Sequence, residues 1–177
     1  MTEKRVSGET IFKGRIFTVE RDTVDCGSHT STREVVRHPG GVSVLAVDEN
    51  DRVVMVRQYR YAAGRELLEL PAGRLEPGED PVAAGIRELS EETGYTAACI
   101  KPLGRMIPTG GYCSEVIWLY LATGLTEGEA HPDDGENVKA ELLPLTDALR
   151  MVLSGEIEDG KTAYALMKYK LLLEAEQ

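Results

Sequence analysis

The chain has 177 residues, of which 42% are hydrophobic and 28% are charged, a balance typical of one globular domain and not of a disordered chain. Thirty acidic residues against twenty basic ones give a formal net charge of -10, which argues against nucleic acid or an anionic membrane as a partner. Three isolated cysteines, a start without an apolar core and the absence of a bilayer-length apolar run predict a cytoplasmic protein with free thiols.

The first third of the chain is rich in β-forming residues. Residues 10–38 alternate loosely between apolar and polar positions, and the turn-like CGSHT at 26–30 divides them, which predicts a hairpin or two strands. Two further β-rich runs lie in 41–60 on either side of the polar turn 48–51. A short strand is expected at 66–73, stopped by a proline.

A helix is predicted directly afterwards, and both of its ends are marked. Asp80 is a good N-cap, Pro81 suits the first helical position, and Gly94 suits a C-terminal stop. Gly85 lies beside the expected core-facing stripe, where a missing side chain allows close packing. The residues of that stripe recur at helical spacing: Val82, Ile86, Leu89 and Thr93.

The rest of the chain predicts strands and then helices. A glycine-rich loop is expected at 108–115 and an acidic loop at 127–137. Thr146 is the expected N-cap of the next helix, and Gly155 its stop. The predicted elements are strands at 100–107, 115–123 and 138–145, and helices at 146–156 and 161–175. Strands around one long helix, with helices at the end, indicate a mixed α/β sandwich whose sheet topology stays open.

Three glutamates fall within one turn of the first predicted helix. Glu88 and Glu92 share a face, Glu91 is close to both, and the cluster is expected to lie well away from the core-facing stripe. Like charges at this spacing repel by roughly 0.2–0.5 kcal/mol per exposed pair. A hard cation such as Mg²⁺ or Mn²⁺ would offset the repulsion, since such ions prefer carboxylate oxygens. Arg87 can pair with Glu91, and the alternative is a solvated acidic face.

The spacing around this cluster resembles the Nudix box, G-x5-E-x7-R-E-U-x-E-E-x-G-U, in which U is a bulky apolar residue. The chain carries Gly73, Glu79 and then RELSEETG at 87–94, so every fixed position matches. Tyr95 is aromatic where the last position is commonly aliphatic, and we expect this to affect packing only. The resemblance implies a Nudix α/β/α sandwich with a mixed sheet, and a Mg²⁺- or Mn²⁺-dependent hydrolase of a nucleoside diphosphate linked to another group.

The resemblance also implies roles for individual residues. Glu91 is expected as a further metal ligand or as a catalytic carboxylate acting through water, and Arg87 as the catalytic-site residue that buttresses the carboxylates. Glu79 is expected to join loop and helix. Glu136, in the acidic loop, aligns with a glutamate that acts as general base in similar enzymes. The implied metal ligands are the backbone carbonyl of Ala72 and the side chains of Glu88, Glu91 and Glu92.

Nearly the whole chain resembles the ADP-ribose pyrophosphatase branch of this family, through 8–24, 31–47 and 56–73. That likeness implies hydrolysis of ADP-ribose to AMP and ribose 5-phosphate. It also implies a Nudix domain at 41–177 and a homodimer in which the strands of 1–40 are exchanged to help build the partner's site. The branch usually carries a proline where Gly110 stands, whereas Pro108 comes two positions early. Other nucleoside diphosphate sugars, such as ADP-glucose or GDP-mannose, therefore stay open, as does a non-catalytic nucleotide-sensing module.

Four residues outside the box are predicted substrate contacts. Arg57 and Arg60 end an apolar strand, and the planar donor fork of arginine suits a diphosphate. Solvated arginines at a strand edge are the alternative. Glu69 precedes the box, and Glu115 falls where the branch has an acidic residue.

Overall fold

The computed structural model describes residues 2–132 and 137–175. These residues form two compact units. The first unit comprises Met1–Gly40 and Ile107–Val116, and the second comprises Gly41–Met106 and Ile117–Gln177.

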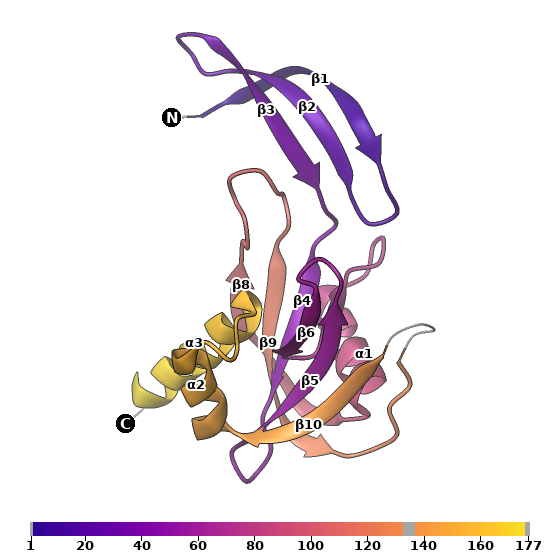
Figure 1. The fold of residues 1–177 in the computed structure, drawn as a ribbon, viewed down its shortest axis with the longest axis vertical. Helices are drawn as coiled ribbons and strands as arrows, with labels where there is room; N and C mark the ends of the chain where they lie inside the picture. Colours follow the sequence, from indigo (N-terminus) through magenta and orange to yellow (C-terminus); the bar gives the residue numbers. More distant parts are fainter. Residues whose placement is uncertain (1, 133–136, 176–177) are drawn as a thin grey trace. The chain divides into compact units, whose positions relative to one another are not determined.

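The first unit is built on an antiparallel sheet of three strands, in the order β1 (Lys4–Lys13), β2 (Thr18–Asp25) and β3 (Thr30–Arg37) (Figure 1). The predicted hairpin was one strand short, because β1 is largely polar and exposed along its whole length and so lacks a clear apolar alternation. The loop at 107–116 belongs to this unit. The backbone of Val36 bonds to that of Tyr112 and Ser114, which attaches the loop to β3.

The second unit contains two sheets. One is mixed, because β4 and β9 run parallel while its other pairs are antiparallel. The other is entirely antiparallel. The mixed sheet has the order β7 (Ala72–Arg74), β4 (Gly41–Ala46), β9 (Ile117–Thr126) and β8 (Thr96–Met106). The antiparallel sheet has the order β10 (Val138–Pro144), β5 (Arg52–Arg60) and β6 (Arg65–Glu69).

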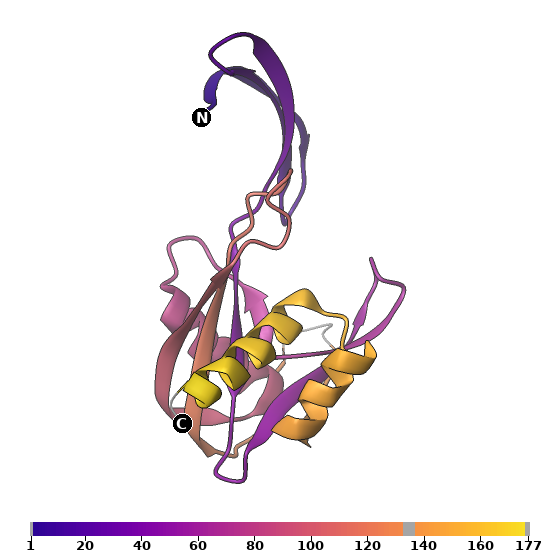
Figure 2. The same ribbon diagram turned by 90° about the vertical axis from the view of Figure 1, so that its left-hand side faces the viewer.

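Helices cover this unit on two sides (Figures 1 and 2). β4 is buried along its whole length, and its side chains alternate between two cores. Val44 faces α1 (Pro81–Thr93), whereas Leu45 faces α2 (Leu145–Ser154) and α3 (Gly160–Ala175). The predicted α/β/α sandwich with a mixed sheet is therefore confirmed.

Both predicted caps of α1 are confirmed, but the predicted core stripe is wrong at one position. The Asp80 carboxylate accepts hydrogen bonds at the helix start, and Gly94 adopts a left-handed conformation with φ 76°. Ile86 is 49% exposed. The small residues on the neighbouring side bring the helix close to the sheet, since a Cβ on Gly85 would lie 3.3 Å from both Tyr120 and Val44. The buried face consists of Ala84, Gly85, Glu88, Leu89, Glu92 and Thr93.

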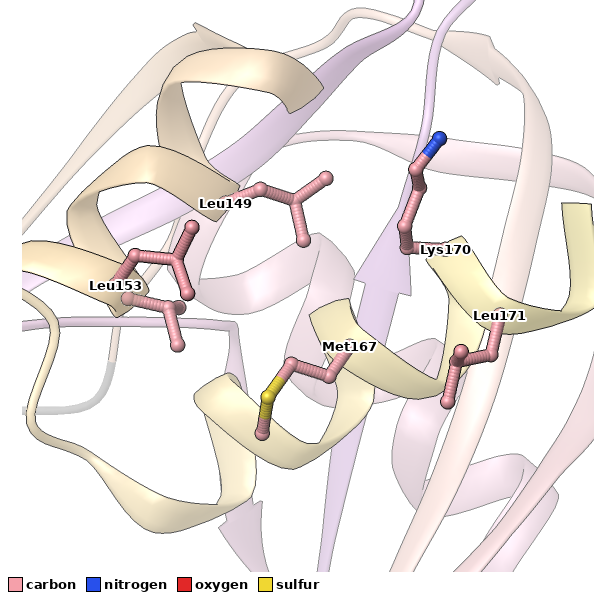
Figure 3. A pocket seen from close by; sticks show the side chains of 6 residues that line it. Leu149, Leu153, Met167, Lys170 and Leu171 are labelled. Carbon is pink, nitrogen blue, oxygen red and sulfur yellow. The ribbon is translucent and has the colours of Figure 1, made fainter. Parts of the chain in front are cut away.

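The last two helices follow the prediction closely, with one correction. Thr146 is not the N-cap of α2, because the helix begins one residue earlier, after Pro144, without a side-chain cap. Gly155 ends it as predicted. An apolar groove of about 330 Å³ between α2 and α3 is lined by residues such as Leu149 and Met167 (Figure 3). In the described parts of the chain, none of the helices is both long and apolar enough to span a membrane.

Candidate active site

The residues of the box bring β7 against α1. The backbone N–H of Ala72 donates to Oε2 of Glu92 over 2.9 Å. Gly73 leaves room for the second carboxylate, because a Cβ at this position would lie 1.8 Å from Oε1 of Glu88. The box glycine therefore allows the Glu88 side chain to lie directly against the strand.

Arg87 organises the other side of the cluster. Its Nε and Nη2 donate to the two oxygens of Glu79, over 2.9 and 3.1 Å. Its Nη1 donates to Oε1 of Glu88 and to Oε2 of Glu91, each over 2.9 Å. The predicted pairing of Arg87 with Glu91 is confirmed, and the bonds to Glu79 tie the loop to the helix.

These hydrogen bonds set the ionisation of the groups involved. The bond from Arg87 holds the pKa of Glu79 below its usual range, and the bond to Glu79 raises the pKa of the guanidinium. One fixed positive charge thus lies among the carboxylates of Glu79, Glu88 and Glu91. It partly offsets the repulsion between Glu88 and Glu91.

Burial separates the three clustered glutamates. Glu88 is 9% and Glu92 only 3% exposed, while the side chain of Glu91 is 32% exposed. The expectation that the cluster lies well away from the core face is wrong, and so is a fully solvated acidic face. Glu88 and Glu92 belong to the buried face of α1, since Ala84 and Gly85 turn that face towards the sheet.

The donor chemistry of this cluster fits a divalent cation. Carboxylate oxygens are the ligands that hard cations prefer. Two of the three glutamate side chains, those of Glu88 and Glu92, are largely removed from water. Within residues 2–132 and 137–175, no three carboxylate, histidine or cysteine side chains converge as a preassembled metal site. Instead, Glu88 and Glu91 accept hydrogen bonds from Arg87, and Glu92 accepts one from the backbone N–H of Ala72.

A second charged network surrounds Glu69, whose side chain is 1% exposed. Arg60 binds it in a bidentate manner through Nε and Nη2, each over 2.7 Å, and Lys161 also donates to it. Burial opposes the ionisation of Glu69, but the hydrogen bond from Arg60 and the charge of Lys161 hold its pKa below the usual value. The structure thus brings Arg60 and Glu69 together, with Glu69 beneath the arginine.

Sequence reasoning missed Lys161 and its neighbours. Asp159 is the N-cap of α3, because its carboxylate accepts from the backbone N–H of Thr162 over 3.0 Å. The signal was present as an Asp followed by Gly-Lys-Thr at the start of the last predicted helix. The contact with Glu69 could not be found this way, since 92 residues separate it from Lys161.

Arg57 and Glu115 make their described contacts with residues other than those of these two networks. Arg57 pairs with Glu141 of β10 over 2.8 Å, and it points away from Arg60 because an odd spacing on a strand changes the face. Glu115 belongs to the first unit, where its carboxylate lies 3.4 Å from Nδ1 of His38. Glu136 lies outside the described residues.

The box geometry agrees with comparisons to known proteins. The model of the NUDIX domain matches residues 37–166. An ADP-ribose pyrophosphatase of Bacillus subtilis (strain 168) is 39% identical over 100% of this chain and 97% of its own. One of Mycobacterium tuberculosis (strain ATCC 25618 / H37Rv) is 42% identical over 86% of this chain and 75% of its own.

Two further similarities extend along the chain. A methanol dehydrogenase activator of Bacillus methanolicus is 41% identical over 96% of this chain and 93% of its own. A crystal structure of an ADP compounds hydrolase shares the fold, with a TM-score of 0.85 and 22% identity over 99% of this chain and 96% of that one. The complete box, its geometry and the domain match together show that the chain belongs to the Nudix family.

Proposed function

We propose that this protein hydrolyses the diphosphate of ADP-ribose to AMP and ribose 5-phosphate, with Mg²⁺ as the cofactor and Mn²⁺ as a substitute. The observation that carries the chemistry is the Arg87-centred group of carboxylates, packed against a glycine that leaves them room. The choice of ADP-ribose rests on the two ADP-ribose pyrophosphatases at 39% and 42% identity.

The residues that would hold the metal are Glu88, Glu91, Glu92 and the carbonyl of Ala72. A bound divalent cation would neutralise the diphosphate and lower the pKa of a water molecule. Arg87 keeps Glu88 and Glu91 oriented through Nη1, and Ala72 orients Glu92 through its N–H. Contacts of this kind to ligating carboxylates orient them and tune their affinity for the ion.

Arg60 is the proposed diphosphate contact of the second unit. Its Nε and Nη2 are occupied by Glu69, whereas no hydrogen bond among the described residues uses its Nη1. Its side chain is 39% exposed, so this edge can meet a phosphate oxygen. Arg57 and Glu115 stay as proposed contacts to other parts of the substrate.

Glu136 is the proposed general base. It would take a proton from the attacking water as the water oxygen bonds to phosphorus and the bridging phosphorus–oxygen bond breaks. The leaving phosphate departs with the electron pair of that bond. Attack at either phosphorus gives the same two products, AMP and ribose 5-phosphate.

A cytoplasmic homodimer is the proposed assembly, with residues 1–40 as the exchanged extension and residues 41–177 as the Nudix domain. The first unit supports this proposal because it buries few apolar side chains. Its three-stranded sheet exposes large hydrophobic groups that a partner would cover, among them Val6, Ile11 and Phe12, each at least 49% exposed.

A hydrolysis panel tests the proposed function. ADP-ribose, ADP-glucose, GDP-mannose, UDP-glucose, NADH and diadenosine polyphosphates would be compared by kcat/KM, with Mg²⁺ and with EDTA. We expect kcat/KM to be clearly highest for ADP-ribose with Mg²⁺, and we expect EDTA to abolish turnover. A stronger preference for another nucleotide sugar would move the assignment to that sugar, and no turnover of any compound would favour a nucleotide-sensing module.

A further inference from the structure

The charged cluster at the start of α3 supports a role in substrate binding that the Nudix box does not cover. It joins Asp159, Lys161 and Thr162 to Glu69, and through Glu69 to Arg60. None of the α3 residues belongs to the box. We propose that Lys161 is a positioning residue, which holds Glu69 and thereby aims the Nη1 edge of Arg60 at the substrate diphosphate.

Burial makes Lys161 specific for this contact. Its side chain is only 11% exposed, and its Nζ donates to Oε2 of Glu69 and to Oδ2 of Asp159, the latter over 3.0 Å. A buried ammonium that bridges two carboxylates is costly unless both partners stay in place. The pairing therefore fixes the carboxylate of Glu69 in one orientation.

The backbone supports the same arrangement. Thr162 is completely buried, and its hydroxyl donates to Asp159 and accepts from the N–H of Leu70. Leu70 directly follows Glu69 in the chain, so the start of α3 holds both the side chain of Glu69 and the backbone beside it. This is a rigid support, because every contact is short and largely removed from water.

The charges around Arg60 explain why it needs this support. Glu69, Glu92 and Asp159 all contribute to the raised pKa of Arg60, and the hydrogen bond that Arg60 donates to Glu69 is the largest cause. Arg60 therefore lies in the field of Glu92, one of the proposed metal ligands, and in that of Asp159. Lys161 neutralises Asp159. Without Lys161, the uncompensated charge of Asp159 would draw Arg60 away from the diphosphate.

The effect of Lys161 should be on substrate binding. A contact from Arg60 to the diphosphate exists both before and during the reaction, so its loss raises KM more than it lowers kcat. The Lys161→Met variant keeps an unbranched side chain, one atom shorter than lysine, and removes its charge. We expect its KM to rise about tenfold, the usual scale for one charge-assisted hydrogen bond, with kcat within about threefold of wild type.

A double-mutant cycle with Arg60→Gln separates positioning from a general structural effect. If Lys161 acts through Arg60, Lys161→Met should raise KM by less than about twofold in the Arg60→Gln background. Lys170→Met is the matched control, because Lys170 lies on the same helix, pairs with Glu174 and is 46% exposed. It should leave KM and kcat unchanged.

Asp159→Asn is the second variant, since asparagine can still cap α3 while the charge that holds Lys161 is removed. Its rise in KM should likewise disappear in the Arg60→Gln background. Equal effects of Lys161→Met in both backgrounds, or a fall in kcat at unchanged KM, would overturn the proposal. Loss of cooperative thermal unfolding in both variants would also overturn it, by showing a folding element only.

This inference rests on the proposed function, but its failure is distinguishable. The cycle uses whichever substrate of the panel the wild-type protein cleaves fastest, so another preferred sugar leaves it intact. The affinity for that same substrate in EDTA, measured by titration calorimetry, gives a second readout without turnover. There too, Lys161→Met should weaken binding in the wild-type background and not in Arg60→Gln.

Discussion

Gly73 offers the sharpest test of how the carboxylates are arranged. A Cβ at this position would lie 1.8 Å from Oε1, 2.0 Å from Cδ and 2.4 Å from Oε2 of Glu88. Ordinary van der Waals contact begins at 3.4 Å, so in Gly73→Ala the nearest oxygen must move by about 1.6 Å, the difference between 3.4 and 1.8 Å. The atoms that must move belong to a flexible side chain, and Gly73 does not have a positive φ, so the backbone tolerates alanine.

The expected result is a large loss of activity at nearly unchanged stability. A misplacement of about 1 Å can cost about 10²-fold in rate, so we expect kcat/KM for ADP-ribose to fall by about 100-fold. Replacing glycine by alanine stabilises a compatible backbone by about 0.4–1 kcal/mol, which offsets part of the lost hydrogen bond between Arg87 and Glu88. The melting temperature should therefore stay within about 5 °C of wild type.

The control is Gly160→Ala, at the start of α3. Its Cβ would meet only the Cε of Met106, at 4.0 Å, so activity should not change. Steady-state hydrolysis and thermal unfolding by circular dichroism would be measured for all three proteins. If Gly73→Ala kept kcat/KM within about threefold of wild type, the position of Glu88 against β7 would not matter and the reasoning would be refuted.

Two further predictions concern stability and assembly. Because the pKa of Glu79 is lowered from its ordinary 4.5, its ion pair stabilises the fold above that pH and loses this effect as the pH falls through the lowered value. At pH 7, Glu79→Gln should thus have a lower urea midpoint of unfolding than wild type. The difference between the two midpoints should narrow below about pH 4.5, and a difference that stays constant down to pH 3 would contradict this. Light scattering should give a dimer for the full chain and a monomer after removal of residues 1–40, and a monomeric full chain would argue against an exchanged sheet.

Sequence reasoning was most successful where the signal is local. The caps of α1 depend on Asp80, Pro81 and Gly94, whose backbone preferences act within a few residues, and all three were correctly interpreted. The box likewise predicted that Arg87 meets Glu91, because four residues on a helix make one turn. These features could be predicted without knowledge of the tertiary structure.

The errors come from packing between distant segments. The exposed position of Ile86 follows from Ala84 and Gly85, whose small size brings a neighbouring face to the sheet although they carry little hydrophobic signal. That rotation buries Glu88 and Glu92. The network of Glu69, Arg60 and Lys161 joins three elements, and no periodic pattern of the sequence records such a contact.

The most direct test of the account is metal binding by the α1 glutamates. The affinity for Mn²⁺ would be measured by electron paramagnetic resonance of the free ion, for wild type, Glu92→Gln and Glu174→Gln. Glu174→Gln is the control, because the side chain of Glu174 on α3 is 53% exposed. Glutamine at 92 can still accept the Ala72 N–H, so the fold should survive. We predict that Glu92→Gln weakens Mn²⁺ binding by at least about tenfold while the control does not. Equal affinity in all three proteins would contradict a metal site on this helix.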